Sequence, residues 1–415
     1  MFPAQYLIDV KKVKYPIVKT AIGRTKFIQV SNDPKAALIW WDGFISTDEY
    51  INLLPYQKIN KIPGMDVICY KSNFFQSLQK MKNIYPSFYS FFATTFQLPY
   101  QYSEFLLENN RLQGKATWIF KPRAGCSGIG IRLIQNSLDV SRESRSAIIQ
   151  RYISPYLIDG YKFDFRLYIL ISKVSPYTVY IYEDGLARFC SEPYTPPNCQ
   201  NLDNHFSHLT NTAVNVKSGE HDNICRLASS VLQLIPNNSA LWNKIKQDVA
   251  LTMIALLPQI IHNINLYSLD NRESKKKFSN PPHPYLSPID RYFHICGIDI
   301  LINHRGEPFV LELNDRPSLS VTFPIEEPLK TKMIFDALKV MFTNEFGGWQ
   351  KILPPPETTL TSNVLNQIQQ QVLKGVKIPS SMPTIQKNQK TQKPSIPRYY
   401  NPKHSNLPPL SRTLQ

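Results

Sequence analysis

The sequence lacks the cysteine patterns of a disulfide-stapled or zinc-binding protein. Its six cysteines form neither a CxxC pair nor a Cys/His set with the spacing of metal ligands. These absences argue against a disulfide framework and a zinc module, and they are typical of a protein in a reducing compartment. The first residues lack an apolar stretch, and no apolar run approaches about eighteen residues. We therefore expect no signal peptide, no membrane-spanning segment and no membrane partner.

Acidic residues are scarce relative to basic ones. There are 31 Asp and Glu against 47 Lys and Arg, which gives a net charge of +16. Such a charge favours an anionic partner, either nucleic acid, an anionic membrane or an acidic protein surface. No nucleic-acid reader motif accompanies the basic residues, so we expect no nucleic acid among the partners.

The chain is too long for one ordinary core, so we expect several packed units and a tail. Short β-like runs predict a small α/β domain in residues 1–95. Residues 96–160 and 161–346 form two further segments. Residues 347–415 are basic and rich in Pro and Gln, which predicts a mostly disordered tail with one helix within residues 357–377.

Local patterns predict several individual elements. Apolar residues at helical spacing predict helices over residues 73–82, 240–263 and 328–345, the second of them a core helix. Residues 178–182 and 186–190 are predicted to form a hairpin, with Glu183-Asp184-Gly185 as its turn.

The stretch of residues 293–319 carries the strongest chemical signal. It predicts two apolar strands joined by a polar turn, with Asp299 in the first strand and Glu312 and Asn314 in the second. Residues two apart in a strand share a face, and a hairpin can bring Asp299 beside them. These oxygen donors suit Mg²⁺ held together with nucleotide phosphates. The alternative is a hairpin with a wet polar side, but the apolar neighbours favour the metal site because an unpaired buried carboxylate is costly.

A second pattern is the glycine-containing loop that follows Lys121 and ends at Gly130. Its glycines would let backbone N–H groups approach an anion closely. It is not a P-loop, because no GK[ST] follows the glycines, and it is not a dinucleotide fingerprint, because a strand follows it. An ordinary glycine hairpin explains this loop equally well.

A third pattern is the alternation in the strand that contains Lys162, Asp164 and Arg166. These charged residues share one face and phenylalanines occupy the other. A solvated edge is one interpretation, and a strand that lines a cleft is the other. Arg188 lies in a later strand, where a lone arginine is usually at the surface.

Taken together, these motifs resemble the tubulin tyrosine ligase-like family, and within it the tubulin polyglutamylase branch. The resemblance runs from about residue 25 to residue 345. It is carried by the segments PGMDVICYK (63–71), IFKPRAGCSGIGI (119–131), QRYISPYLIDGYKFDFRLYIL (150–170), GLARF (185–189), HLTNTAVN (208–215) and CGIDILIN with FVLELNDRPSL (296–319).

The resemblance implies an α/β (α+β) fold of the ATP-grasp type, with a small N-terminal α/β domain and a disordered basic C-terminal tail. In that reading residues 96–160 are the central ATP-grasp subdomain, and residues 161–346 are the C-terminal subdomain with the metal site. It also implies ATP and Mg²⁺ as cofactors. ATP would phosphorylate an acceptor carboxylate, and the amine of a free amino acid would attack the acyl phosphate.

The resemblance also implies roles for particular residues. Those that match nucleotide-binding positions are Lys71, Lys121, Ile129, Gly130, Gln150, Arg151, Tyr152, Ile153, Lys162, Asp164, Thr210 and Asn211. Those that match positions around the amino-acid substrate are Arg188, Thr212, Ala213 and Arg226. Asp299, Glu312 and Asn314 match the Mg²⁺ ligands, and the catalytic pair would be Arg166, beside the transferred phosphate, and Glu312.

The sequence departs from the family at two places. The glycine loop lacks the family's basic residue, and Thr212-Ala213 replace the usual Tyr-Ser. Arg226 is the candidate substitute for a lysine expected downstream. The segment after the metal strand, residues 317–341, resembles the glutamylase branch, so we expect glutamate as the added amino acid.

The expected function is therefore an ATP-dependent ligase that adds free L-glutamate to the acidic C-terminal tails of tubulin. We expect a monomer on cytoplasmic microtubules of the cytoskeleton, with a cilium, flagellum or basal body as the place that family analogy suggests. Glycine, tyrosine or a non-tubulin acceptor with the same mechanism is the alternative. A non-catalytic microtubule-binding protein is the alternative from another class.

Overall fold

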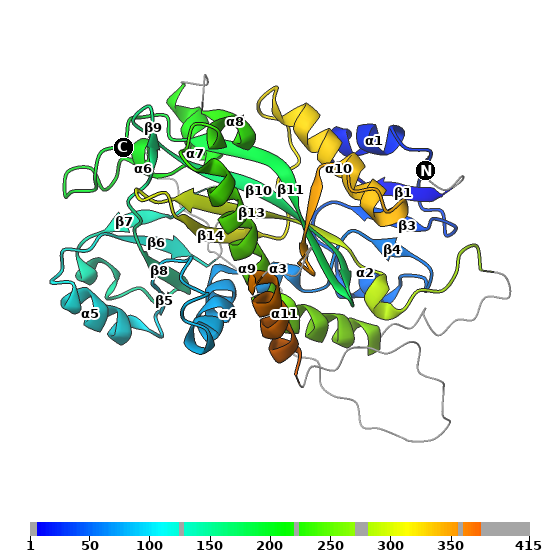
Figure 1. Cartoon of the computed structure of the whole chain (residues 1–415), viewed down its shortest axis with the longest axis horizontal. Coiled ribbons are helices and arrows are strands. Elements are labelled where there is room, and N and C mark those ends of the chain that lie inside the picture. The colour runs from blue at the N-terminus through cyan, green and yellow to red at the C-terminus, as the bar shows by residue number, and fades with distance from the viewer. Residues whose placement is uncertain (1–5, 124–127, 220–223, 270–280, 356–359, 375–415) are drawn as a thin grey trace, which may run out of the picture. The chain divides into compact units, whose positions relative to one another are not determined.

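A computed structural model describes residues 6–123, 128–219, 224–269, 281–355 and 360–374. All of these residues belong to one compact unit, Met1–Ser381. Helices and strands alternate along the chain and the strands form three sheets (Figure 1), so the predicted mixed α/β class is confirmed. Residues 375–415, most of the predicted tail, lie outside the described residues.

The N-terminal residues form a parallel sheet with the strand order β2-β1-β3-β4. Its elements are β1 (Leu7–Lys12), α1 (Pro16–Gly23), β2 (Ile28–Val30), β3 (Leu38–Trp41), α2 (Thr47–Ile51) and β4 (Lys58–Ile59). Helix α1 packs against α10 (Glu326–Phe342), which comes from the far end of the fold (Figure 1). Helices α3 (Met65–Ile68) and α4 (Lys71–Ile84) follow, and α4 confirms the helix predicted over residues 73–82.

The central residues form an antiparallel sheet with the order β5-β8-β6-β7. Its elements are β5 (Thr95–Leu98), α5 (Tyr102–Arg111), β6 (Trp118–Pro122), β7 (Arg132–Ile134), the 3-10 turn η1 (Ser137–Val140) and β8 (Ala147–Arg151). This sheet has a small core of its own, in which Phe105 packs edge-to-face on Trp118.

The largest sheet is antiparallel and has the order β12-β11-β10-β13-β14. Strand β9 also pairs with β10, and β15 pairs with β11. The strands are β9 (Leu157–Ile158), β10 (Tyr161–Val174), β11 (Tyr177–Phe189), β12 (Cys225–Leu227), β13 (His294–Ile302), β14 (Pro308–Asn314) and β15 (Trp349–Leu353). Between them lie α6 (His205–His208), α7 (Thr212–Asn215), η2 (Val216–Ser218), α8 (Ala228–Leu232), α9 (Asn238–Leu269) and η4 (Pro288–Asp290).

The alternation predicted for β10 is present. Phe163, Phe165 and Leu167 are buried in the cluster that includes α9, whereas Tyr168 belongs to the cluster that includes α10. Because successive side chains of a strand point to opposite faces, both faces of this sheet are covered. Near the start of β10, one face carries Lys162 and Asp164 in place of apolar residues, and both side chains are buried.

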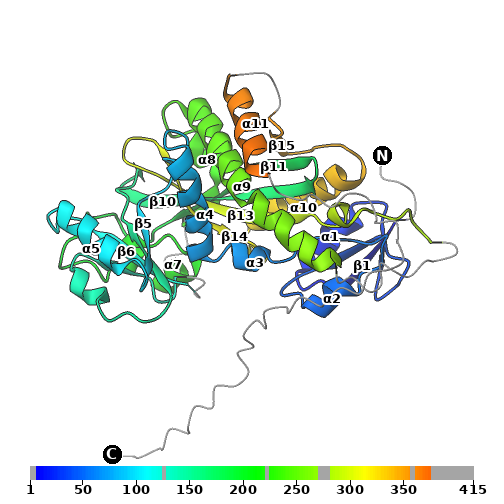
Figure 2. The ribbon, with the colours of Figure 1, turned by 90° about the horizontal axis from the view of Figure 1, so that it is seen from below.

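Helix α9 is the long buried helix of the fold, and it runs beside α4 and α11 (Leu360–Leu373) (Figure 2). By length and composition it could cross a membrane, but most of its apolar stretch is buried within this chain. Val249, Met253 and Leu257 are fully buried at helical spacing. The predicted core helix is therefore confirmed, and it extends beyond residues 240–263 at both ends.

The predicted hairpin differs from the structure. Residues 178–190 do not form a hairpin, because β11 pairs with β10 over residues 177–181 and again over residues 185–189. The register shifts between Ile181 and Gly185, so the residues predicted as a turn form an irregularity in a continuous strand. Asp184 is held there by Ser229, whose hydroxyl donates to it at 2.8 Å.

Part of the predicted tail belongs to the fold. Residues Trp349–Leu353 pair with β11 as β15, and Trp349 and Leu353 are buried. The helix predicted within residues 357–377 is present as α11, with Leu365 and Ile368 buried in the cluster that includes α9. Residues 349–353 show no alternation strong enough to identify so short a strand.

His294, at the start of β13, connects two loops: the loop that contains Ile62 and the loop that follows β14 at Asp315. Its Nδ1 accepts a hydrogen bond from the backbone N–H of Ile62 at 3.0 Å, and its Nε2 donates to the carbonyl of Asp315 at 2.6 Å. Burial lowers the pKa of His294 to about 3. The ring is therefore neutral in the folded protein at ordinary pH.

This burial predicts an acid-dependent loss of stability. An unfolded histidine has a pKa of about 6.5 and takes up a proton that the buried ring cannot accept, so stability falls as the pH falls below about 6.5. We expect wild type to lose up to about 1.4 kcal/mol more per pH unit than His294→Gln. Denaturant titrations between about pH 6.5 and 4.5 measure this slope.

The exposed His304 offers a matched control. His304→Gln should keep the wild-type slope. Equal slopes for wild type and His294→Gln would contradict the assigned charge state of His294.

Candidate active site

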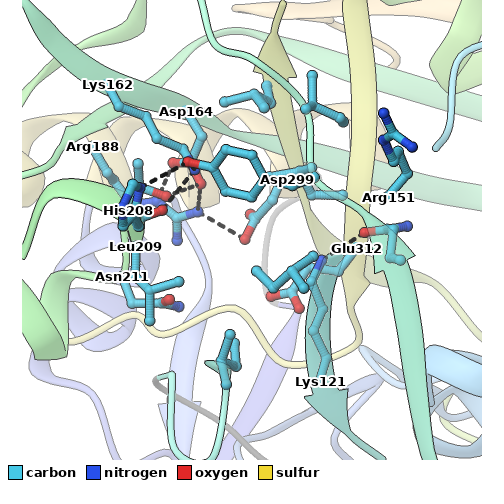
Figure 3. A pocket seen from close by; sticks show the side chains of 18 residues that line it. Lys121, Arg151, Lys162, Asp164, Arg188, His208, Leu209, Asn211, Asp299 and Glu312 are labelled. Carbon is cyan, nitrogen blue, oxygen red and sulfur yellow. Dashed lines mark hydrogen bonds and ion pairs between the residues drawn. The ribbon is translucent and has the colours of Figure 1, made fainter. Parts of the chain in front are cut away.

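The central and largest sheets together line a pocket. Figure 3 shows its side chains converging from β6, β8, β10, β11, β13 and β14, and from the segment after α6. The predicted residues that line it are Lys121, Gln150, Arg151, Tyr152, Ile153, Lys162, Asp164, Arg188, Thr210, Asn211, Asp299 and Glu312. The face of β10 that carries charge thus lines a cleft and is not a solvated edge.

Two arginines and two carboxylates form a buried network along one wall. Arg166 on β10 lies directly opposite Asp299 on β13, and Arg188 on β11 lies opposite Asp164 on β10. The guanidinium of Arg188 donates to both oxygens of Asp164 at 2.7 Å and to Asp299 at 2.8 Å. Thr210 donates its hydroxyl to Asp164 at 2.6 Å. Such paired, hydrogen-bonded charges are the form in which buried ions are tolerated.

Asp299 is the centre of this network. Burial acts to raise its pKa, but the guanidinium groups of Arg166 and Arg188 outweigh burial and hold the pKa well below its usual range. The carboxylate is therefore ionised at neutral pH. Figure 3 shows it between Arg188 and Glu312.

Glu312 lies directly opposite Asp299 in the β13–β14 pairing. Like charges at such positions repel each other, so this pair needs cations nearby. The register shifts between this pair and Ile300, which lies opposite Val310. Leu311 is the extra residue of that β-bulge, and it lines the pocket together with Glu312. Bulges of this kind commonly redirect side chains next to active sites.

The remaining predicted ligand, Asn314, lies one step outside the pocket. Its Nδ2 donates to Glu312 at 3.1 Å. Lys71 approaches Glu312 from the start of α4 at 3.5 Å. Lys71, Asn314 and Arg166 therefore do not line the pocket themselves, but each contacts a carboxylate that does.

The oxygen donors on β13 and β14 suit Mg²⁺ that is bound together with phosphates. In the described residues no group of three or more His, Cys, Asp or Glu could hold a metal by itself. Mg²⁺ does not require such a cage, since it is usually held by one or two carboxylates together with water and substrate phosphates. Asp299 and Glu312, with the amide of Asn314 beside them, supply that kind of incomplete set.

A buried lysine lies beside Glu312 in the pocket (Figure 3). Lys121 at the end of β6 donates to Oε1 of Gln150 at 2.8 Å, and Gln150 is fixed in turn by Thr95 at 2.9 Å. Burial lowers the pKa of Lys121 to about 8, although the nearby Glu312 acts to raise it. A cation held this way by neutral partners keeps its charge available for an anionic ligand.

Only part of the predicted glycine loop can be placed. Residues 124–127 lie outside the described residues. Gly128 has a φ of +84°, and a side chain there would meet Val214 and Asn211, so the loop lies against α7. Ile129 is 72% exposed and does not line the pocket, whereas Ile131 does. Of the predicted loop residues, neither Ile129 nor Gly130 lines the pocket; the chain reaches the pocket at Ile131, just after the loop.

Three predicted substrate residues lie away from the pocket lining. Thr212 and Ala213 begin α7, just beyond Asn211. Arg226 on β12 lies opposite Ala187, while Arg188 lies opposite Cys225. Arg226 therefore points to the other face of the sheet from Arg188, where its guanidinium covers the ring of Phe189 at 4.6 Å. The structure does not bring Arg226 to the pocket in the place of the expected lysine.

Arg188 is in the pocket, but with different partners from those expected. It was predicted to grip a substrate carboxylate, whereas its guanidinium binds Asp164 and Asp299. Its role toward a substrate remains a prediction.

Sequence reasoning missed the residues that complete the lining. These are Ile119, Ile131, His208, Leu209, Leu301 and Leu311. The isoleucines and leucines in this list are typical of the apolar surface that packs on the flat ring of a ligand. His208 was present in the HLTN segment that pointed to the family, but nothing in the spacing marked it apart from its neighbours.

Comparisons with known proteins agree with this site. The profile of the Tubulin-tyrosine ligase family matches residues 49–347. The chain is 35% identical over 355 residues to a probable beta-tubulin polyglutamylase of Tetrahymena thermophila. It is 31% identical over 341 residues to tubulin polyglutamylase ttll6 of Danio rerio, and 32% identical over 344 residues to tubulin polyglutamylase TTLL13 of Homo sapiens.

These alignments cover 81%, 80% and 80% of this chain, but 28%, 42% and 40% of the three relatives. The chain therefore spans less than half the length of these relatives.

The charge network predicts that Asp299 matters for folding as well as for ligands. Asp299→Asn would leave Arg166 and Arg188 buried with one carboxylate fewer. We expect it to lower the free energy of unfolding by about 3–5 kcal/mol, as measured by denaturant titration. The exposed Asp203 provides the control, because Asp203→Asn should change stability by less than about 0.5 kcal/mol. A small effect of Asp299→Asn would contradict the network's structural role.

Proposed function

The chain belongs to the Tubulin-tyrosine ligase family, and we propose that it is an ATP-dependent ligase that attaches glutamate to the acidic tails of tubulin. The observation that carries this proposal is the pocket edge where Asp299 and Glu312 are paired across β13 and β14, with Lys121 near Glu312. Paired carboxylates among buried cations are suited to a metal–phosphate complex. The mixed α/β fold of the family, of the ATP-grasp type, provides two sheets that line one pocket.

The chemistry needs an activated acceptor, because a carboxylate is a poor electrophile. When bound, ATP with Mg²⁺ supplies the phosphoryl group that converts the acceptor carboxylate to an acyl phosphate, from which the amine of the amino acid releases phosphate. We assign Asp299, Glu312 and Asn314 to the metal. Lys71 and Lys121 would offset the phosphate charge, and Arg166 would do so at the phosphate being transferred.

The remaining pocket residues would bind the nucleoside. Residues 150–153 form the end of β8 and its continuation, where backbone groups can meet a base edge. Lys162, Asp164 and Asn211 lie on the other side of the pocket from Arg151 (Figure 3), and the hydroxyl of Tyr152 reaches Lys162 at 3.0 Å. Thr210 also lines the pocket. The apolar Ile131, Leu301 and Leu311 would cover the faces of the ring.

The acceptor and the amino acid are inferred from charge and from relatives. The relatives' names give tubulin as the protein modified and glutamate chains as the product class. A net charge of +16 favours an acidic acceptor, and exposed cations are dense near the N-terminus, at Lys11, Lys12, Lys14, Lys19, Arg24 and Lys26. We therefore propose microtubules as its place of action, while a cilium, flagellum or basal body remains a prediction.

The direct test is incorporation of radiolabelled amino acids into polymerised microtubules with Mg-ATP. We expect wild type to incorporate glutamate and Glu312→Gln to lose at least about 100-fold in rate, because it removes one metal ligand. Glu312 is partly exposed, and its ion pair with Lys71 at 3.5 Å is not fully buried, so loss of its charge should cost less than about 1 kcal/mol of stability.

Glu307 offers a matched control on the same hairpin. It is exposed and lies at the turn end, away from the pocket, so Glu307→Gln should keep wild-type uptake. Uptake of glycine or tyrosine in place of glutamate would overturn the choice of amino acid but keep the mechanism. Microtubule binding without uptake of any of the three would favour a non-catalytic binding protein.

The pKa of Lys121 predicts how nucleotide affinity depends on pH. The lysine binds phosphate as a cation and, with a pKa of about 8, is mostly neutral by pH 9. We expect the Kd for ATP, measured by calorimetry, to rise up to about tenfold from pH 7 to pH 9. Lys121→Arg keeps its charge over this range and should show a flat profile. Parallel profiles for both proteins would contradict the assignment of Lys121 to the phosphates.

A further inference from the structure

Arg123 directly follows β6 and is exposed, just outside the lining of the pocket. Two alternate residues of β6, Ile119 and Lys121, line the pocket. The backbone N–H of Arg123 donates to the carbonyl of Ser146 at 2.9 Å, so the pairing of β6 with the segment of β8 continues past the end of the strand. Because alternate residues of an extended chain share a face, Arg123 follows Lys121 on the side of the pocket.

The guanidinium of Arg123 lies over the ring of Tyr70, with Cζ 4.6 Å from the ring centroid. Tyr70 immediately precedes Lys71, the first residue of α4, and Nζ of Lys71 lies 3.5 Å from Glu312. Lys121 is close enough to Lys71 and Glu312 for both of them to affect its pKa. The alternation of β6 and the contact with Tyr70 therefore both place Arg123 at the end of the pocket assigned to the metal and the phosphates.

The contact with Tyr70 leaves the N–H groups of Arg123 available to other partners. A guanidinium meets an aromatic ring through its face, whereas its N–H donors point outward in its plane. No ion pair or hydrogen bond of this guanidinium is present among the residues that the structure describes. Two other exposed arginines of the central region, Arg111 and Arg145, are each paired with a nearby glutamate. Arg123 thus presents a fixed fork of donors that fits the two oxygens of a carboxylate.

We propose that Arg123 binds a carboxylate of the acidic acceptor chain, next to the carboxylate that reacts, and that Tyr70 positions its guanidinium. The inference rests on the proposed function, because it requires an acidic chain to meet the phosphate end of the bound nucleotide. It adds to that function a residue that receives the acceptor at the place of reaction.

The depths of the three cations favour the acceptor over the nucleotide as the partner of Arg123. Lys121 is 6% exposed, the side chain of Lys71 is 14% exposed, and Arg123 is fully at the surface. Phosphates held with a metal at Asp299 and Glu312 would meet the two lysines first. The reacting carboxylate must come from solvent to the transferred phosphate, so its neighbours along an acidic chain pass the outermost cation.

The test is incorporation of radiolabelled glutamate by the full chain, with the concentrations of microtubules and of Mg-ATP varied separately. Arg123→Ala removes an exposed side chain and should fold like wild type. We expect it to raise the KM for microtubules by about two- to fivefold, the effect of one exposed ion pair, and to leave the KM for ATP unchanged. The difference from wild type should shrink as salt is added, because exposed charges are screened.

Lys115 offers a matched control just before β6, at the end opposite Arg123. It is exposed, and Lys115→Ala removes the same charge, so this variant should keep both KM values. Tyr70→Leu removes the ring that positions the guanidinium and should raise the KM for microtubules as Arg123→Ala does. Tyr70→Phe keeps the ring and should raise it less.

An unchanged KM for microtubules in Arg123→Ala would overturn this role, and so would an equal rise in Lys115→Ala, which would indicate a general effect of net charge. A higher KM for ATP with an unchanged KM for microtubules would assign Arg123 to the phosphates instead. In all these cases glutamate uptake by wild type would leave the proposed function intact. Wild type that incorporates no amino acid would overturn the proposed function, and the acceptor role of Arg123 with it.

Discussion

The rest of this structure depends on one constraint: the buried aspartates of the largest sheet must each be paired with an arginine. Asp164 and Asp299 lie on neighbouring strands with almost no access to water, and each faces an arginine in register on the adjacent strand. Unpaired, either carboxylate would be far too costly to bury. The arginines make their burial tolerable, and in doing so they fix how β11, β10 and β13 align. Glu312 stands just beyond this balanced set, with only lysines to offset its charge. The pocket edge is thus left with an excess of oxygen donors where the sheet ends.

Much of this arrangement could be predicted from local sequence. The alternation of β10, the turn between β13 and β14 and the apolar spacing of α9 each depend on residues a few positions apart, and each is present. The pairing of Arg188 with Asp299 could not be predicted that way, since 111 residues separate them and only the strand order joins them. The bulge at Leu311 was also invisible, because it reflects how β14 fits β13 and not a residue preference.

The errors have the same origin. Glu183-Asp184-Gly185 has the composition of a turn, but pairing with β10 on one side overrides that preference. Arg226 is close to Arg188 in the sheet and has the expected chemistry, yet a one-residue difference in register places it on the opposite face. His208 has no charge pattern at all, and it is held in the pocket wall by Tyr152, which follows β8, and by Lys162 on β10. In each of these cases the outcome is set by tertiary contacts, which the spacing of residues along the sequence does not reveal.

The pairing of β15 with β11 has a practical consequence for anyone shortening this chain. Strand β11 has one edge bonded to β10, and its other edge is covered by β12 over residues 186–188 and by β15 over residues 179–182. A version cut at Gly347, where the composition changes, would uncover the backbone of a strand whose side chains are almost wholly buried. Such an open apolar edge is a template for pairing between molecules, so that version would aggregate when concentrated. The functional boundary of this domain therefore lies beyond Leu353, inside what composition alone marks as tail.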